Sequence, residues 1–333
     1  MATPTENEAQ QQVLEADDGA YTDSDSAFPD DTTSASTSIS SSIRAYKYEN
    51  GRRYHAYREG EYVLPNDEKE QDRLDLFHHI FRMILGGSLY CAPVPETIHK
   101  ALDFGTGTGI WAIDLADEKP ECEVLGTDIS PIQPGWVPPN CKFIIDDITQ
   151  DWAYGPVFDF IHGRGMGGTV SDWDALYTEA FDSLKPGGWI EMQEYAIEYA
   201  SDDGTLEKAK NLTKWIDQLN EASASFGKDM NMAKKHKGLM EKAGFVNVRE
   251  QVFKVPVGPW AKDKALKEIG KYTIIHTIEA VEPFTLALFS RVLGYSKDEI
   301  DVLLAGLRKE LRDPEIHIYT PFHFIYGQKP ETA

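Results

Sequence analysis

The chain has 333 residues and a formal net charge of −22, from 55 Asp+Glu against 33 Lys+Arg. Its 41% hydrophobic residues and 7 tryptophans are typical of a folded protein, and no apolar run approaches the roughly 20 residues that span a bilayer. The acidic surplus argues against direct contact with nucleic acid, which needs clustered Lys and Arg. The 3 cysteines form no CxxC pair, so we predict neither a disulfide scaffold nor a metal site. With no signal peptide pattern at the N-terminus, we expect a cytoplasmic protein.

The negative charge is unevenly distributed. Residues 1–43 contain nine acidic residues and neither Lys nor Arg. Their low-complexity run TTSASTSISSS cannot bury enough apolar surface to offset the entropy of ordering the chain. We therefore predict a disordered, acidic, Ser/Thr-rich tail over 1–43. It is either a solvating arm or a phosphorylatable segment that binds a protein partner.

An alternation of short apolar runs and helical patterns begins after residue 44. The segment 44–92 is first aromatic and basic, and then has helical periodicity from an N-cap at Asn66 to Gly86-Gly87. The later helical patterns are Gly109–Glu118, Trp173–Leu184 and Gly204–Ser225. The apolar runs that predict buried parallel strands are Lys100–Phe104, Glu123–Thr127, Lys142–Ile145, Val157–His162 and Trp189–Tyr195. This order is typical of a doubly wound α/β sheet.

The C-terminal third departs from simple alternation. Phe245–Val257 and Ile316–Tyr326 are predicted strands, and the segment 259–313 between them is mostly helical in pattern. Its predicted helices are Ala265–Val281, Phe284–Leu293 and Ser296–Arg312, the last with a capping box of Ser296 and Glu299. Such an insertion would form a helical cap over the carboxyl edge of the sheet, where ligands bind in folds of this kind.

The most specific motif is a glycine-rich loop between a predicted strand and a predicted helix. Its sequence, DFGTGTGIW, starts at Asp103. Glycine allows a ligand to approach the backbone, and the helix N-terminus supplies free N–H groups. Ile110 replaces the third glycine of the dinucleotide-binding GxGxxG pattern, and Asp103 would repel a pyrophosphate. The loop therefore favours S-adenosylmethionine (SAM), which is cationic and phosphate-free, over NAD.

Acidic residues end the next two predicted strands. Asp128 lies 19 residues past Gly109, where a carboxylate can accept both ribose hydroxyls of an adenosyl group. A turn or capping role is the alternative, because a Ser-Pro pair that fits a helix start follows it. Asp146 and Asp147 end the third strand, where one of them, with Asp147 favoured, can accept the adenine amino group. A solvated turn is the alternative for this pair.

Several longer stretches resemble one family. DFGTGTGIWAIDLAD, GTDISPIQPGWVPPN, FDFIHGR and LKPGGWIEMQE, with YHAYREGEYVLPNDEKEQDRLDL upstream, are similar to the fungal LaeA-like (TAM-domain) methyltransferases. The resemblance covers about residues 46–329. It implies one SAM-dependent methyltransferase domain over 44–333, with a Rossmann-like class I fold, a seven-stranded, mostly parallel sheet whose last strand is antiparallel, and a helical cap. The predicted SAM site comprises Asp103, Gly105, Thr106, Gly107, Gly109, Asp128, Ile129, Asp146, Asp147 and Ile148.

Two side chains at strand ends are candidates for chemistry at the methyl group. His162 ends the fourth strand and titrates near neutrality, so it could act as a general base for a protonated acceptor. A structural histidine is an equal alternative. Glu194 ends the fifth strand and has two possible roles, a contact to the substrate or a structural one. Arg164 could orient an acidic acceptor or pair with a nearby carboxylate.

Aromatic residues of the 44–92 segment and of the cap could complete the site. Tyr54 and Tyr57 could wall the methionine end of the cofactor, and Tyr62 the acceptor, with ordinary packing as the alternative. Trp260 is a candidate substrate contact. Further candidates for the acceptor pocket are His276, Phe284, Arg291 and His317. The alternative is that they belong to the hydrophobic core, as aromatic residues at helical spacing usually do.

These features predict a SAM-dependent methyltransferase that acts on a small-molecule acceptor in secondary metabolite biosynthesis, with no membrane contact. The alternative is a LaeA-like nuclear regulator of secondary-metabolite clusters that works through protein partners. An NAD-dependent dehydrogenase is disfavoured by Asp103 and Ile110.

Overall fold

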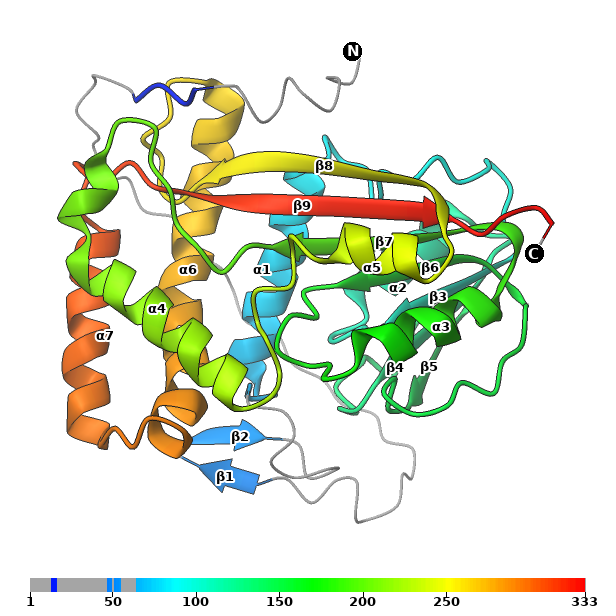
Figure 1. Ribbon diagram of the computed structural model, residues 1–333, viewed down its shortest axis with the longest axis horizontal. Coiled ribbons are helices and arrows are strands. Elements are labelled where there is room, and N and C mark those ends of the chain that lie inside the picture. The colour runs from blue at the N-terminus through cyan, green and yellow to red at the C-terminus, as the bar shows by residue number, and fades with distance from the viewer. Residues whose placement is uncertain (1–12, 17–46, 50, 55–63, 333) are drawn as a thin grey trace.

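A seven-stranded sheet forms the centre of the molecule. The computed structural model describes residues 13–16, 47–49, 51–54 and 64–332 (Figure 1). The strand order is β5-β4-β3-β6-β7-β9-β8; β9 is antiparallel to both of its neighbours, and the other pairs are parallel. The strands are β3 Lys100–Phe104, β4 Glu123–Asp128, β5 Cys141–Ile145, β6 Phe158–Arg164, β7 Leu184–Tyr195, β8 Val246–Pro256 and β9 Tyr319–Gln328. This topology confirms the predicted fold class.

Helices cover both faces of the sheet because the strands alternate apolar side chains to either side. α3 (Trp173–Ser183) and α5 (His236–Lys242) lie on one face, in a core that contains Ile190 of β7. On the opposite face, α1 (Glu68–Ile84) packs against β9, and α2 (Ile110–Glu118) packs against β6. The glycine-rich loop therefore lies between the end of β3, the neighbouring strand β4 and the start of α2.

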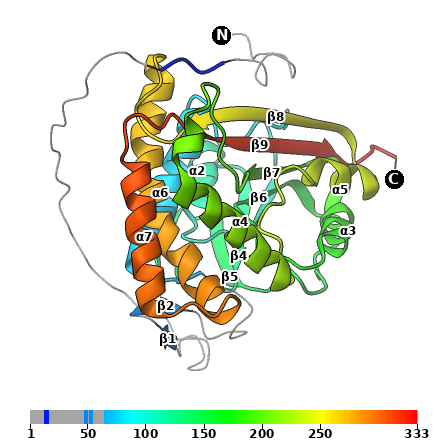
Figure 2. The same ribbon diagram turned by 60° about the vertical axis from the view of Figure 1, so that its left-hand side comes forward.

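Three helices pack together beyond one end of the sheet (Figures 1 and 2). They are α4 (Lys210–Ser225), which follows the short 3-10 helix η1 (Thr205–Lys208), and the pair α6 (Lys264–Arg291) and α7 (Lys297–Leu311). Figure 1 shows β9 running away from these helices. The parallel strands run the other way and point their carboxyl ends toward the three helices, which is the edge where ligands bind in such folds.

α6 is one continuous helix, although the sequence predicts a break between Val281 and Phe284. Pro283 lies inside it and removes one backbone hydrogen bond. Pro283 and its neighbours Val281 and Phe284 are buried, so packing on α4 and α7 compensates for that loss. A local proline signal could not reveal this tertiary support.

Two short segments from the N-terminal part lie against the cap. The hairpin of β1 (Lys47–Glu49) and β2 (Arg52–Tyr54) places Arg52 at 3.6 Å from a carboxylate oxygen of Glu282 on α6. Residues 13–16 fall within the segment predicted as a disordered tail, and the structure places these four against the start of the cap.

The contacts of residues 13–16 are specific. Ala16 forms a β-bridge with Ala261, and the N–H of Leu14 donates to an Asp202 carboxylate oxygen at 2.8 Å. The side chain of Leu14 is buried. The remaining residues of 1–43 lie outside the described part of the chain.

Within the described residues, no helix is long and apolar enough to cross a membrane. In the same part of the chain, no group of three or more His, Cys, Asp or Glu side chains is placed to bind a metal ion.

Candidate active site

The glycine-rich loop connects β3 to α2 and is tied to the neighbouring strand. The N–H of Thr106 donates to the carbonyl oxygen of Thr127 at the end of β4, at 2.9 Å. Gly105 has φ +63, and a Cβ at this position would lie 2.2 Å from the sulfur of Met166. A side chain at this position would therefore be strained by the positive φ and would displace Met166, so glycine suits this path of the backbone.

Asp128, at the end of β4, braces the same loop. Its Oδ2 accepts a hydrogen bond from the N–H of Gly107 at 2.8 Å, and its Oδ1 accepts one from the N–H of Ser130 at 2.8 Å. Burial raises the pKa of this carboxyl to about 6. The group is thus held in one orientation at the carboxyl edge of the sheet.

A first cavity opens beside this loop and encloses about 830 Å³ of empty space, counting its open side. It is lined by seven of the residues predicted to hold the cofactor: Gly105, Gly107, Asp128, Ile129, Asp146, Asp147 and Ile148. Its other walls include Leu74, Arg164, Met166 and Lys228. The strand-end residues that the sequence placed together are therefore together in space.

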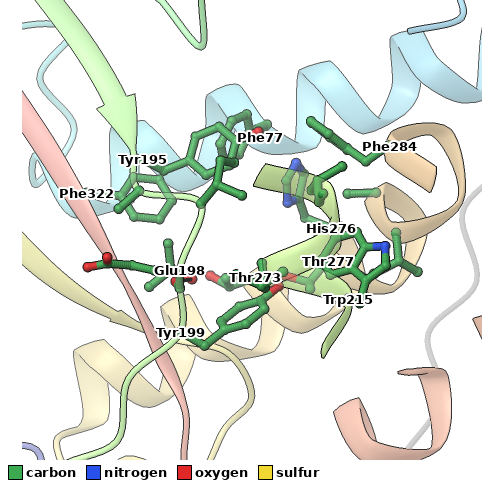
Figure 3. Close-up of a pocket in the computed structure, with 17 residues that line it drawn as sticks. Phe77, Tyr195, Glu198, Tyr199, Trp215, Thr273, His276, Thr277, Phe284 and Phe322 are labelled. Carbon is green, nitrogen blue, oxygen red and sulfur yellow. Dashed lines mark hydrogen bonds between the residues drawn. The ribbon is translucent and has the colours of Figure 1, made fainter. Parts of the chain in front are cut away.

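A second cavity adjoins the first across the glycine loop. The two share Leu74, Gly105, Gly107, Arg164 and Gly165, and the second is also lined by Asp103 and Thr106. A third, largely apolar cavity continues from the second (Figure 3), and the walls common to both are Phe77, Tyr195 and Phe284. The three cavities form a row from the strand ends to the cap helices.

Known proteins are similar to this chain over most of its length. A search of solved structures finds Haemonchus contortus phosphoethanolamine N-methyltransferase 2 in complex with SAM, with a TM-score of 0.42, 16% identity, and coverage of 81% of this chain and 54% of that one. A family model described as a methyltransferase domain matches residues 76–250. Methyltransferase pytC of Aspergillus terreus is 42% identical over 301 residues, which is 90% of this chain and 93% of pytC. Secondary metabolism regulator LAE1 of Cochliobolus heterostrophus is 38% identical over 290 residues, 85% of this chain and 94% of LAE1.

The chain belongs to the fungal LaeA-like methyltransferases. This confirms the predicted family, and with it a SAM-dependent methyltransferase activity. The row of cavities is therefore the candidate active site of a LaeA-like enzyme.

His162 does not occupy the place predicted for a general base. Its side chain is fully buried, lies against the indole of Trp111 with ring centroids 3.7 Å apart, and lines none of the three cavities formed by the described residues. Its Nδ1 is 2.7 Å from Oδ1 of Asp103, whose Oδ2 accepts a hydrogen bond from the hydroxyl of Thr106. Burial lowers the pKa of His162. In this LaeA-like enzyme the histidine fixes the Asp103 carboxylate rather than contacting an acceptor.

Glu194 is likewise internal. It accepts a hydrogen bond from the N–H of Met166 at 2.6 Å and lines none of these cavities. Burial raises its pKa to about 8. Its position braces the turn after β6, which matches the structural alternative of the two roles left open for it.

Arg164 sits at the junction of the first two cavities, beside the residues predicted to bind the cofactor rather than the cap. Its guanidinium lies 3.1 Å from Nδ1 of His78 and over the ring of Phe81. Burial lowers its pKa to about 10, so it remains a cation at neutral pH. This cation faces a cavity edge that also carries Asp103.

Several other predicted contacts lie elsewhere. The ring of Tyr54 is buried under Arg291, and Trp260 donates to the Ile318 carbonyl oxygen beside His317. None of Tyr54, Trp260, Arg291, His317 and Gly109 lines the three cavities formed by the described residues. Tyr57 and Tyr62 lie outside the described residues.

The structure adds residues that the sequence did not single out. Arg73 and Phe77 of α1 and Tyr195 at the end of β7 line the second cavity. The helical periodicity of α1 indicated an apolar face but not that the cavity would form against it. Of the cap candidates, His276 and Phe284 line the third cavity.

Proposed function

We propose that this enzyme transfers the methyl group of SAM to a small-molecule acceptor of secondary metabolism. The observation that carries the proposal is the row of three cavities, whose last member is a buried pocket beyond the glycine loop. Further support comes from the methyltransferase name of pytC and the secondary-metabolism name of LAE1. When bound, SAM supplies a methyl group on a sulfonium, which an acceptor atom displaces in line.

The residues of the first two cavities suit the parts of SAM. In this proposal Asp128 accepts the ribose hydroxyls, and Asp147, or Asp146 beside it, accepts the adenine amino group. Ile129 and Ile148 supply apolar walls for the ring, since both line the first cavity.

The second cavity suits the charged methionyl end. The carboxylate of Asp103 matches the ammonium group, and the guanidinium of Arg164 matches the carboxylate. Because His162 and Thr106 hold both oxygens of Asp103, this charge is oriented before the cofactor arrives. The role proposed for Arg164 therefore moves from acceptor to cofactor.

The experiment follows the labelled methyl group. Purified enzyme is incubated with SAM that carries a radiolabelled methyl group and with an ethyl acetate extract of a host strain lacking the gene. We expect label in an organic-soluble product, loss of that product with Asp128→Ala, and its retention with Asp117→Ala, an exposed acid on α2. Label that enters only protein, or no label with the wild type, would contradict a small-molecule acceptor.

The second candidate function is a regulator that recruits protein partners, which the similarity to LAE1 favours. In that case the acidic segment 1–43 is the docking arm. Deletion of residues 1–43 then abolishes partner recruitment, whereas methyl transfer to a metabolite survives the deletion. The regulator would be expected in the nucleus, and the small-molecule methyltransferase in the cytoplasm.

A further inference from the structure

The third cavity is enclosed by elements that are distant in the sequence. Figure 3 shows Phe77, Tyr195 and Phe322 on one side of it and His276, Thr277 and Trp215 on the other. These side chains come from α1, β7, β9, α6 and α4. It encloses about 530 Å³ of empty space, counting its open side, which is within the range of small-molecule sites.

No uncompensated charge faces this cavity among the described residues. The lining carboxylate of Glu198 is bound by Lys234 through both oxygens at 2.7 Å. Arg73, next to the cavity wall, is paired with Glu70 at 2.5 Å. A charged ligand would lose its hydration without gaining a counter-ion there, so the cavity suits an uncharged molecule.

His276 presents a defined hydrogen-bonding group at this wall. Its Nε2 lies 2.6 Å from Nη1 of Arg73, and arginine can only donate. Nε2 is therefore the acceptor, and the single proton of the neutral ring is on Nδ1. Burial and the Arg73 charge lower the pKa of His276 well below its usual value, which keeps the ring neutral.

The Nδ1 proton of His276 has no acceptor within the described part of the chain. The ring is stacked on Phe77 with centroids 4.1 Å apart and is held at Nε2 by Arg73, so its orientation is fixed at one face and at one edge. Two phenols, Tyr195 and Tyr199, also line the cavity, and burial raises the pKa of each, so both keep their protons. The cavity thus combines apolar walls with donors for an oxygen.

We propose that the third cavity binds the methyl acceptor, that the acceptor is an uncharged, largely apolar compound bearing an oxygen, and that His276, held by Arg73, donates to that oxygen from Nδ1. This inference rests on the proposed function, since it assigns the substrate end of the same site. As a hydrogen-bond donor to the acceptor's oxygen, His276 is a specificity residue and not a general base.

Binding is measured directly with a probe of this chemistry. The probe is 1-tetralone, a bicyclic ketone without a titratable group, titrated by calorimetry into the wild-type enzyme saturated with S-adenosylhomocysteine (SAH). We expect saturable binding that Ala280→Phe, which fills the cavity, reduces at least about tenfold, a free-energy difference of about 1.4 kcal/mol. The matched control is Ala265→Phe, the same change at an exposed position of α6, which should bind as the wild type does. No binding to the wild type, or equal binding to Ala280→Phe, overturns the cavity assignment.

The hydrogen bond is tested with the oxygen-free analogue tetralin. His276→Leu should weaken 1-tetralone about fivefold to tenfold, as expected for one lost hydrogen bond, and leave tetralin unchanged. His276→Gln keeps an acceptor for Arg73 and a donor for the cavity, so it should restore 1-tetralone binding. Equal effects of His276→Leu on both probes, or no recovery with His276→Gln, overturn the donor role.

Failure of this inference can be told from failure of the proposed function. If the radiolabelled methyl group enters organic-soluble products while Ala280→Phe leaves that product unchanged, the enzyme is a small-molecule methyltransferase with another acceptor site. If 1-tetralone binds as expected but only protein is labelled, the cavity binds an apolar ring but its occupant is not the acceptor, and both proposals fail. SAH affinity, measured for every variant, shows that the cofactor site is intact.

Discussion

Asp128 combines a raised pKa, about 6, with two backbone hydrogen bonds that hold it at the first cavity. A carboxylate accepts hydrogen bonds more strongly than a neutral carboxyl group does. We expect SAH affinity to be constant above about pH 7 and to fall below about pH 6, by up to about tenfold per pH unit. Calorimetric titrations between pH 8 and pH 5 measure this. In Asp128→Asn, binding should be weaker throughout and the inflection near pH 6 absent; the same inflection in that variant would exclude Asp128 as its source.

Gly105 is a loop position where a side chain would be unfavourable. Gly105→Ala combines an unfavourable φ of +63 with a contact of 2.2 Å to Met166, whereas Gly204→Ala has a similar φ of +79 and open surroundings. We expect Gly105→Ala to weaken SAH binding by at least about tenfold, or about 1.4 kcal/mol, and Gly204→Ala to leave it unchanged. Equal SAH dissociation constants for the two variants would contradict the geometry of the loop.

The sequence predicts which side chains lie together at the first cavity where the pattern is local. The glycine loop, Asp128 and the Asp146–Ile148 corner follow strand ends, and the carboxyl ends of neighbouring parallel strands meet at one edge. His162 also ends a strand, but its role depends on Trp111 and Asp103, which hold it inside the fold. The direction in which a strand-end side chain points is set by such partners and is invisible in a pattern.

Among the elements, β7 is connected to the turn after β6 through a buried carboxyl. Glu194 has a pKa of about 8 in the folded protein against an ordinary value of 4.5, and its neighbour His236, 3.8 Å away, has a pKa lowered to about 3 and is neutral. The folded state therefore binds a proton that the unfolded state releases. The stability from this group is fully present below about pH 4.5 and is lost as the pH rises through about 8.

Urea unfolding at several pH values tests this connection. The free energy of unfolding should fall between about pH 5 and pH 8, with a slope from Glu194 of up to about 1.4 kcal/mol per pH unit. Glu194→Gln removes that part of the slope, while other buried carboxyls such as Glu191 still contribute. Parallel stability curves for the wild type and Glu194→Gln would show that Glu194 is ionised in the folded state.

Most element types were predictable because their apolar residues follow a helical period or form short apolar runs, but the β1–β2 hairpin and α5 were not predicted. The capping box of Ser296 and Glu299 is present as predicted at the start of α7. Several boundaries differ from the predicted ones, and two of them have a clear physical reason: Asp67, one residue after Asn66, caps α1, and α6 continues through Pro283. In both cases contacts made elsewhere in the chain decide where the helix begins or ends.

At the scale of the whole molecule, the third cavity could not be predicted. It joins Phe77, Trp215 and His276, which are separated by more than sixty positions from one to the next. Sequence patterns place such residues on apolar helix faces but do not show which faces leave a gap between them. The proposed substrate end of the enzyme is therefore a property of packing, whereas the proposed cofactor end is largely a property of motifs.

The central claim is that this LaeA-like enzyme methylates one small molecule through this row of cavities. The most direct measurement compares metabolites, by mass spectrometry, in a host strain lacking the gene and in the same strain complemented with the wild type or with Asp128→Ala. We predict that one compound is replaced by its precursor without the methyl group, and that only the wild type restores it. Broad loss of many unrelated metabolites, with no such precursor, would contradict the claim and favour the regulator.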